Sequence, residues 1–370
     1  MVHRRIRQFA ANRRIDQKLL VAYLAALVGG LVMVYSMSSI LAEARLGSHL
    51  HFFRNQFIWA LLSLAAIYAI CRLNLTQITR YSPLAFLGTL VLLALVFLFD
   101  PRNGSHRWIQ FGPFTFQPSE LFKLVMVAFW AYSFSNQKRD VTDPKELFGR
   151  YVPVVGVGLL LILLEPDFGT TVVVFLTALG MLFLAGAKLR HLALAVMPLI
   201  GTAAVMVFGL GYKKPRVIDF LASLPDPLQG SYQSKQAALA LGAGGLFGVG
   251  FGDGRQKLFF LPYPHTDFIF AAMGEEIGLI GLLIVLACLF YILWRGLRIA
   301  YGQPDRFGYL LAAGLVLSLF VNVAINLGVV TSLLPVTGLA LPFFSYGGSS
   351  LLISSASVGV LLNLSRRVTT

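Results

Sequence analysis

The sequence predicts an all-α protein that crosses a membrane several times. Of its 370 residues, 57% are hydrophobic and only 12% are charged, a composition that is not typical of a soluble domain. The apolar residues gather in repeated runs, most of them close to the ~20 residues that a transmembrane helix needs. About ten such runs can be counted, so we expect one polytopic helical domain over residues 19–364.

The expected spans follow one another from the N-terminus. Residues 1–18 are basic, and the apolar run behind them is too long for a signal-peptide core and has no obvious cleavage site, so it stays as the first span. The full set of expected spans is 19–40, 53–70, 81–99, 119–135, 151–164, 170–186, 191–211, 267–294, 308–331 and 345–364. An even number of spans places both termini on one side of the membrane.

The positions of the basic residues predict the orientation. The net charge is +14, but the Lys and Arg residues lie in short clusters between apolar runs, which is typical of cytoplasmic loops facing anionic lipid and not of nucleic-acid binding. We therefore expect residues 1–18 and the tail 365–370 in the cytoplasm. The segment 213–266, between the seventh and eighth spans, is then a large extracytoplasmic loop. A site outside the cytoplasmic (inner) membrane has no access to cytosolic nucleotide sugars, so its activated substrate would arrive on a lipid of the same membrane.

Tyr212–Glu276 is the longest polar interruption, and there we expect the chemistry. Seven glycines lie between Gly242 and Gly254, which describes a backbone that bends tightly and lets a ligand approach closely. The stretch ends in PHTDFIF, and an apolar helix carrying Glu275 and Glu276 follows. Carboxylates inside a membrane span are costly and normally face partners or a cavity. We expect this pair to form interhelical contacts more than to take part in the chemistry.

Three shorter outer segments are also specialised. In 100–120, apolar residues alternate around Gly112, which predicts a short hairpin, with Arg107 before it. Glu165–Thr170, which contains Asp167, is a tight turn between two spans that turn chemistry and helix capping explain in large part. The uncharged segment 334–350 has two prolines and a Gly-Gly pair, which indicates a re-entrant or broken segment of the kind that must be covered by protein or water.

Metal and redox chemistry have little support in the sequence. The two cysteines, Cys71 and Cys288, lie at the end of one apolar run and inside another, where small buried side chains are the simplest interpretation. His265 has no second histidine near it, so metal binding there is improbable. No Walker-type lysine follows the glycines, which disfavours a nucleotide-fuelled pump. No cofactor is firmly predicted, and a divalent cation stays possible.

Seven stretches, in this order, carry a resemblance to a known family. They are HRWIQFG, FQPSELFK, EPDFGT, MLFLAGAKL, SYQSKQAALALGAGGLFGVGFG, QKLFFLPYPHTDFIFAAMGEEIGLIG and LPFFSYGGSSLL. Together they resemble the SEDS proteins (shape, elongation, division and sporulation), with FtsW-type members closer than RodA-type members. The resemblance implies glycosyl transfer from lipid II to a nascent glycan chain during septal or cell-wall synthesis. It also implies a class B penicillin-binding protein, a transpeptidase, as partner, together with other divisome or elongasome membrane proteins.

Such a transfer needs a base for the acceptor hydroxyl, positive groups for the leaving pyrophosphate and a groove for the sugars. Asp267 is the best base candidate, and the family pattern places its proposed catalytic aspartate at this position. A helix N-terminus favours an ionised carboxylate, so the aspartate would be ready to accept a proton at neutral pH. The alternative is that Asp267 or Thr266 only caps the helix.

The remaining candidates divide into substrate contacts and supporting residues. The candidate substrate contacts are Arg107, Lys123, Arg216, Gln236, His265, Thr266, Ser345 and Tyr346. The candidate supporting residues are Glu120, Asp167, Glu275 and Glu276. The arginines could equally anchor the protein at the membrane interface, and Lys123 could simply pair with Glu120 three residues earlier.

Two rival functions suit the same pattern. A flippase that moves lipid II would also have about ten spans, broken helices and intramembrane carboxylates. A division scaffold without activity would need only its surfaces. The densest polar and glycine-rich content lies in the segment expected outside, which favours the enzyme.

Overall fold

The computed structural model describes residues 14–101, 105–112, 114–135, 141–209, 211 and 214–368. Most of the predicted basic N-terminus, residues 1–13, lies outside this part, as do the last two residues of the predicted tail. Within it the protein is almost entirely helical, and the strands form one two-stranded sheet.

The helices fall on the predicted apolar runs. They are α2 (Gln17–Leu46), α3 (His51–Arg72), α4 (Leu75–Leu95) with η1 (Val96–Leu98), α5 (Pro118–Ser135), α6 (Pro144–Glu146) with η2 (Leu147–Tyr151) and α7 (Val152–Leu164), α8 (Phe168–Leu184), α9 (Leu189–Ala204) with η3 (Val205–Gly209), α12 (Ile269–Tyr301), α13 (Arg306–Val330) and α14 (Gly348–Ser365). Among the described residues, seven helices are long and apolar enough to cross a membrane. The chain is thus a multi-pass helical membrane protein.

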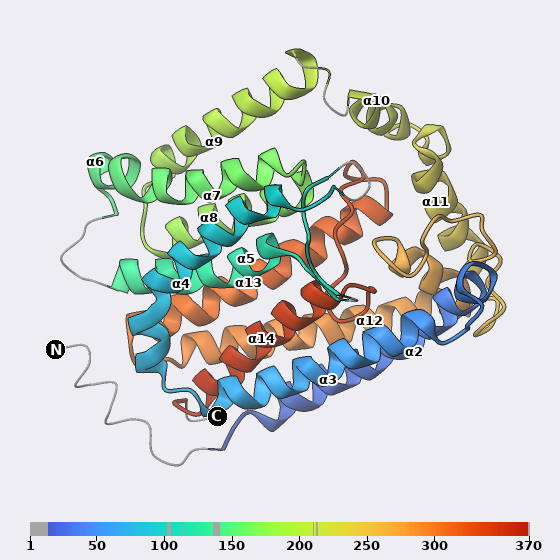
Figure 1. Ribbon diagram of the computed structural model, residues 1–370, viewed down its shortest axis with the longest axis horizontal. Helices are drawn as coiled ribbons and strands as arrows, with labels where there is room; N and C mark the ends of the chain where they lie inside the picture. The colour runs from blue at the N-terminus through green and yellow to red at the C-terminus, as the bar shows by residue number, and fades with distance from the viewer. Residues whose placement is uncertain are drawn as a thin grey trace.

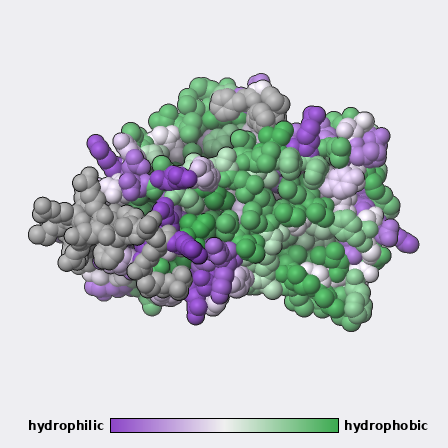
Figure 2. Space-filling model, turned by 90° about the horizontal axis from the view of Figure 1, so that it is seen from below, coloured by the Kyte–Doolittle hydropathy of each residue, from purple (hydrophilic) through white to green (hydrophobic). Residues whose placement is uncertain are grey.

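The bundle is built around α13 and α14, whose apolar surfaces are mostly buried, whereas α3 and α4 expose most of theirs. α14 packs along α3, and α12 lies between α2 and α13 (Figure 1). A view of one face shows a broad hydrophobic surface between hydrophilic side chains at either end (Figure 2). Such a belt is what a bilayer requires of a helix bundle.

Both ends of the described chain lie at the same end of the bundle (Figure 1). Asp16 caps α2, and its backbone N–H donates to Ser365 Oγ at 2.9 Å. Arg295 of α12 donates through Nε to Asp16 Oδ2 at 3.0 Å. The helices of the long polar stretch, α10 (Lys214–Ser223) and α11 (Tyr232–Gly244), lie at the opposite end with η4 (Pro227–Gln229) between them.

The predicted hairpin is present. Strands β1 (Ile109–Phe111) and β2 (Phe114–Phe116) pair antiparallel, with Ile109 opposite Phe116. Residues 334–347 of the uncharged segment contain no helix, residues 348–350 begin α14, and residues 339–345 are mostly buried. It is therefore a broken segment covered by protein, as its composition predicts.

Two glycines of the string lie directly against the backbone of α12. A Cβ on Gly244 would sit 1.9 Å from the carbonyl oxygen of Gly274, and one on Gly248 would sit 2.1 Å from that of Glu276. Gly278 interrupts α12 with φ 64 and ψ −173, a conformation that glycine adopts readily. The small residues let two parts of the backbone touch, so the close approach that the sequence indicated is made by α12 itself.

Candidate functional site

Asp267 lies in the turn that precedes α12. Its Oδ1 accepts a hydrogen bond from Thr266 Oγ1 at 2.8 Å, and the residue is half-buried. The helix begins at Ile269, and its capping position, Phe268, has no side-chain capping bond. The alternative that Asp267 or Thr266 merely caps the helix is therefore wrong.

The environment of Asp267 raises its pKa. Burial is the largest cause, and the Thr266 hydroxyl, a backbone hydrogen bond and the positive charge of Arg216 oppose it. The sequence predicted a carboxylate kept ionised by the helix N-terminus, but desolvation outweighs that effect here. A raised pKa makes the carboxylate a stronger base, which suits proton abstraction near neutral pH.

Three consecutive backbone carbonyls at this turn receive hydrogen bonds from elsewhere in the chain. The carbonyl of residue 265 accepts from the Tyr346 N–H at 2.8 Å, that of residue 266 from Ser345 Oγ at 2.7 Å, and that of Asp267 from Asn326 Nδ2 at 2.8 Å. Residues 265–267 precede α12, so their carbonyls lie outside the regular i+4 hydrogen bonds of that helix and can accept from other parts of the chain. The donors come from α13 and from the uncharged segment, so both fix the turn.

The His265 ring packs between this turn and α3. Its ring lies 4.6 Å from the Phe52 ring and 5.4 Å from the Tyr346 ring, centroid to centroid. The side chain is buried, and burial lowers its pKa to about 4, with the charge of Arg45 adding to the effect. A neutral, buried imidazole packs the turn against α3, and it offers no accessible surface to a ligand in this structure.

Sequence reasoning missed two polar residues that hold the segment in place. Asn326 Nδ2 donates to Leu339 O at 2.7 Å as well as to Asp267 O. Gln56 Nε2 donates to Ser345 O at 3.1 Å, while its Oε1 accepts from the Gly347 N–H at 3.3 Å. Both interrupt apolar runs, and an amide inside a predicted span is a signal that could have identified them.

A second polar cluster surrounds Arg107. Its guanidinium lies 3.7 Å from Asp167 Oδ1, and its Nε donates to Glu165 O at 3.4 Å. Nη2 also bonds to the carbonyl of Pro166. Asp167 caps α8 through the Thr170 N–H. Asp167 thus caps α8, as the capping interpretation of this turn predicts, and Arg107 is tied to the same turn while its side chain stays partly exposed.

Glu165 is an unexpected member of this cluster. The side chain is fully buried, and neither carboxylate oxygen has a hydrogen-bond partner within the described residues. Burial, together with the charge of Asp167 and against that of Arg107, raises its pKa to about 9. At neutral pH the group is therefore a protonated, uncharged acid.

The other predicted charged residues form pairs of their own. Lys123 Nζ lies 2.9 Å from Glu120 Oε1 on α5, and both side chains are buried. Lys123 thus makes the ion pair that was the alternative to anion binding. Glu275 accepts backbone N–H bonds from Arg255 at 2.8 Å and Gln256 at 3.0 Å.

Glu276 pairs with a lysine that the sequence did not single out. Lys257 Nζ lies 2.6 Å from Glu276 Oε1, and Ser36 Oγ of α2 donates to Oε2 at 2.8 Å. These contacts join the segment before α12 to α12, and α12 to α2. They match the expectation that the two carboxylates make structural contacts.

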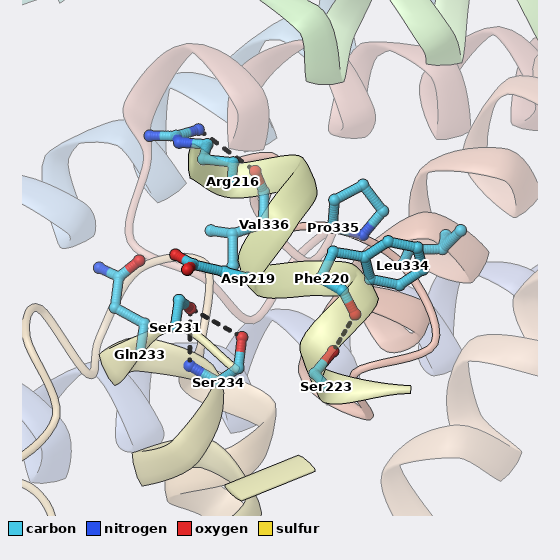
Figure 3. Close-up of a pocket in the computed structure, with 10 residues that line it drawn as sticks. All are labelled: Arg216, Asp219, Phe220, Ser223, Ser231, Gln233, Ser234, Leu334, Pro335 and Val336. Carbon is cyan, nitrogen blue, oxygen red and sulfur yellow. Dashed lines mark hydrogen bonds between the residues drawn. The ribbon is translucent and has the colours of Figure 1, made fainter. Parts of the chain in front are cut away.

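A pocket of about 190 Å³ opens beside α10 and α11 (Figure 3). Arg216 lies at its rim and donates to Val336 O at 3.2 Å, and its charge also acts on Asp267. The lining combines hydrogen-bonding and apolar side chains: Arg216, Asp219, Phe220, Ser223, Ser231, Gln233, Ser234, Leu334, Pro335 and Val336. Gln236 lies on α11, half-buried, outside this lining.

The site residues thus form one connected region. The uncharged segment links the Asp267 turn to the pocket, because its Ser345 bonds to Thr266 O while its Val336 lines the pocket and accepts from Arg216. The uncharged segment also reaches the Arg107 cluster, because Leu339 packs on Gly169, where a Cβ would lie 2.8 Å from Leu339 Cγ. Among the described residues, no group of three or more His, Cys, Asp or Glu side chains is placed to hold a metal ion.

Comparison with known proteins identifies relatives over the whole chain. The family model for FtsW, RodA and SpoVE, described as "Cell cycle protein", matches residues 17–370. "Stage V sporulation protein E" of Bacillus subtilis is 40% identical over 356 residues, 95% of this chain and 97% of that protein. "Probable peptidoglycan glycosyltransferase FtsW" of Geobacter metallireducens is 38% identical over 358 residues, 96% of each chain.

Solved structures share the fold. A chain from "Structural coordination of polymerization and crosslinking by a peptidoglycan synthase complex" superposes with a TM-score of 0.78 at 26% identity, covering 95% of this chain and 98% of that one. The rod shape determining protein RodA of Thermus thermophilus superposes with a TM-score of 0.71 at 27% identity, covering 96% and 98%. The chain therefore belongs to the FtsW/RodA/SpoVE family, the SEDS proteins, and is FtsW-like.

Proposed function

We propose that this chain is a peptidoglycan glycosyltransferase that polymerises lipid II into glycan strands at the outer face of the cytoplasmic membrane. The names of its relatives support the activity, because the Geobacter protein is called a probable peptidoglycan glycosyltransferase and covers 96% of this chain. The observation that carries the proposal is the position of Asp267, half-buried in a turn that Ser345 and Asn326 fix, with the positive charge of Arg216 acting on its carboxylate.

In the proposed reaction, Asp267 is the general base. It takes the proton from an acceptor sugar hydroxyl as that oxygen bonds to the anomeric carbon of the donor. The bond from this carbon to the pyrophosphate oxygen breaks, and undecaprenyl pyrophosphate leaves with the bonding electrons. Arg216 offers positive charge near Asp267, and Arg107 offers a partly exposed guanidinium at the second cluster. Both could stabilise the negative charge that develops on the pyrophosphate.

The pocket next to Arg216 suits part of a saccharide. Asp219 and Gln233 can bond to hydroxyl and acetamido groups, and Phe220 provides an apolar wall. We assign two further predicted contacts, Gln236 on α11 and Tyr346 beside the turn, to the edges of the same substrate site.

The orientation and extent of the domain complete the proposal. We propose ten passes, with residues 1–18 and 365–370 in the cytoplasm and 213–266 on the outside. The shared end of α2 and α14 supports an even number of passes. The solved relative that coordinates polymerization with crosslinking supports a class B penicillin-binding protein as partner.

The replacement Asp267→Asn tests the mechanism. General-base catalysis typically supplies about 10²–10⁴-fold in rate, and we expect polymer formation from lipid II by the purified protein to fall by that factor. Lipid II binding and thermal stability should survive. Because the base must be ionised, the wild-type rate should fall as the pH drops through the raised pKa of Asp267.

The matched control is Asp253→Asn, which changes an exposed aspartate of the same long segment. It should polymerise like the wild type. A near wild-type rate for Asp267→Asn would exclude the base assignment. A loss of lipid II binding in that variant would indicate a role in recognition instead.

A further inference from the structure

Glu165 stands apart from the other buried acids of the described residues. Its side chain is 0% exposed and neither carboxyl oxygen has a hydrogen-bond partner there, whereas Glu120 and Glu276 each pair with a lysine. A buried charge without a partner is so costly that the carboxyl keeps its proton instead. An apolar side chain would fill the same space at lower cost, so the acid at this position calls for an explanation.

The guanidinium of Arg107 lies over the same turn with most of its donors unused. Nε and Nη2 donate to the backbone carbonyls of residues 165 and 166, which takes two of the five N–H groups. Asp167 Oδ1 lies 3.7 Å from Nη1, beyond hydrogen-bond distance. Within the described residues, three N–H groups of Arg107 are therefore left for a ligand.

The charge of Asp167 is already satisfied by other groups. The Thr170 N–H donates to Oδ1 at 3.1 Å, and Gln117 Nε2 and Thr170 Oγ1 each donate to Oδ2 at 2.9 Å. The side chain is 3% exposed, against 15% for Arg107. Of the charged groups at this turn, Arg107 is thus the one that an anion arriving from outside would meet.

The proton on Glu165 decides whether that guanidinium stays free. The charges that act on its carboxyl are those of Asp167 and Arg107. An ionised Glu165 would be a second buried anion next to Asp167, and Arg107 is the cation at hand to compensate it. A charge-assisted bond to Glu165 would turn the N–H groups inward, away from any phosphate outside.

We propose that Glu165 is a positioning residue, which as an uncharged buried acid keeps the free N–H groups of Arg107 available to a phosphate of the lipid-linked substrate. This role rests on the proposed function, which gives Arg107 a phosphate to bind. Glu165 itself touches no substrate and acts through Arg107. Ionising Glu165 should therefore weaken phosphate binding, and only while Arg107 is present.

The test measures equilibrium binding of undecaprenyl pyrophosphate to the purified full chain. The two conditions are about pH 7 and about pH 10, on either side of the value of about 9 to which burial raises the pKa of Glu165. The quantity compared is the ratio of the two Kd values, with the amount of folded protein determined by size exclusion at each pH. Undecaprenol, which has no phosphate, is the control ligand. Glu43→Gln, the same replacement at an exposed glutamate of α2, is the matched control variant.

We expect Kd to rise several-fold from the lower to the higher pH in the wild type and in Glu43→Gln. Glu165→Gln and Glu165→Met cannot ionise, and Arg107→Ala has no guanidinium to withdraw, so all three should lose this rise. A wild type without the rise would overturn the proposal. A rise of wild-type size in any of the three variants, or an equal rise for undecaprenol, would overturn it as well.

Polymer formation from lipid II, measured on the same preparations, tests the proposed function separately. A rise that depends on Glu165 in a protein that forms no polymer would refute the polymerase alone. Polymer formation by a protein without the rise would refute the role of Glu165 alone.

Discussion

Replacing Lys257 with methionine should destabilise the protein strongly, because it leaves a carboxylate buried without its counter-ion. The Lys257 and Glu276 side chains are only 4% and 0% exposed, and their charged atoms lie 2.6 Å apart. Removing one member of a buried ion pair costs about 3–5 kcal/mol. Ser36 still donates one hydrogen bond to Glu276, so we expect the lower half of that range.

A loss of this size is large for a domain whose total stability is about 5–15 kcal/mol. The assay is thermal unfolding of the purified protein in detergent, followed by intrinsic fluorescence at one fixed scan rate. The double variant Lys257→Met with Glu276→Leu should recover most of the loss, because an apolar pair of similar volume often replaces a buried ion pair at little cost.

Arg255→Met is the control, since this side chain lies exposed in the same loop. Surface replacements of this kind usually change stability by no more than about 0.5 kcal/mol. A Lys257→Met variant as stable as the wild type would refute the reasoning. A double variant no better than the single one would also refute it, because lost packing and not an uncompensated charge would then explain the effect.

Three further predictions follow from the other clusters. Because burial raises the pKa of Glu165 to about 9, this side chain holds a proton in the folded protein that it releases in the unfolded chain. The free energy of unfolding should therefore fall as the pH rises from about 5 to 9, by up to about 1.4 kcal/mol per pH unit. Glu165→Gln should flatten this slope in unfolding scans, and an equal slope in the variant would contradict the assignment. Arg107→Ala should weaken lipid II use by about 1.5–3 kcal/mol, against about 0.5–1.5 for Gln236→Ala, and unchanged polymerisation kinetics in both would make them interfacial anchors. In a cysteine-free background, an impermeant thiol reagent applied to spheroplasts should label Ser231→Cys and not Lys188→Cys, and the reverse pattern would invert the orientation.

The helices could be predicted because an apolar run of membrane length has few other solutions. Each expected run coincides with a helix, although only seven described helices meet the length and hydropathy of a span. The shortfall has a physical reason. α5 carries the Glu120–Lys123 pair near its start, and α8 and α9 have only 17 and 16 residues, so none of the three meets the length and hydropathy of a span.

The glycine string shows where sequence reasoning stopped. Repeated glycines correctly indicated that something approaches the backbone closely, but the sequence does not say whether a ligand or another part of the chain does so. The glycine-rich loop lies against a further glycine, Gly278, where α12 is interrupted although no proline lies nearby. The contact joins segments that only the folded chain brings together.

The motif PHTDFIF marks the position of Asp267, but residues elsewhere in the chain hold its turn in place. The residues of PHTDFIF make almost none of the bonds that orient them; Asn326, Ser345 and Tyr346 supply the donors from 59 to 81 positions further along the chain. Those donors bond to backbone carbonyls, whereas the Asp267 carboxylate bonds to the Thr266 hydroxyl and to the backbone of its own residue. The turn should therefore keep its shape when the carboxylate is replaced by an amide of the same size. Because backbone hydrogen bonds hold the turn, the Asp267 side chain does not also have to maintain the fold. The carboxylate can therefore be buried and have a raised pKa, although that burial costs stability.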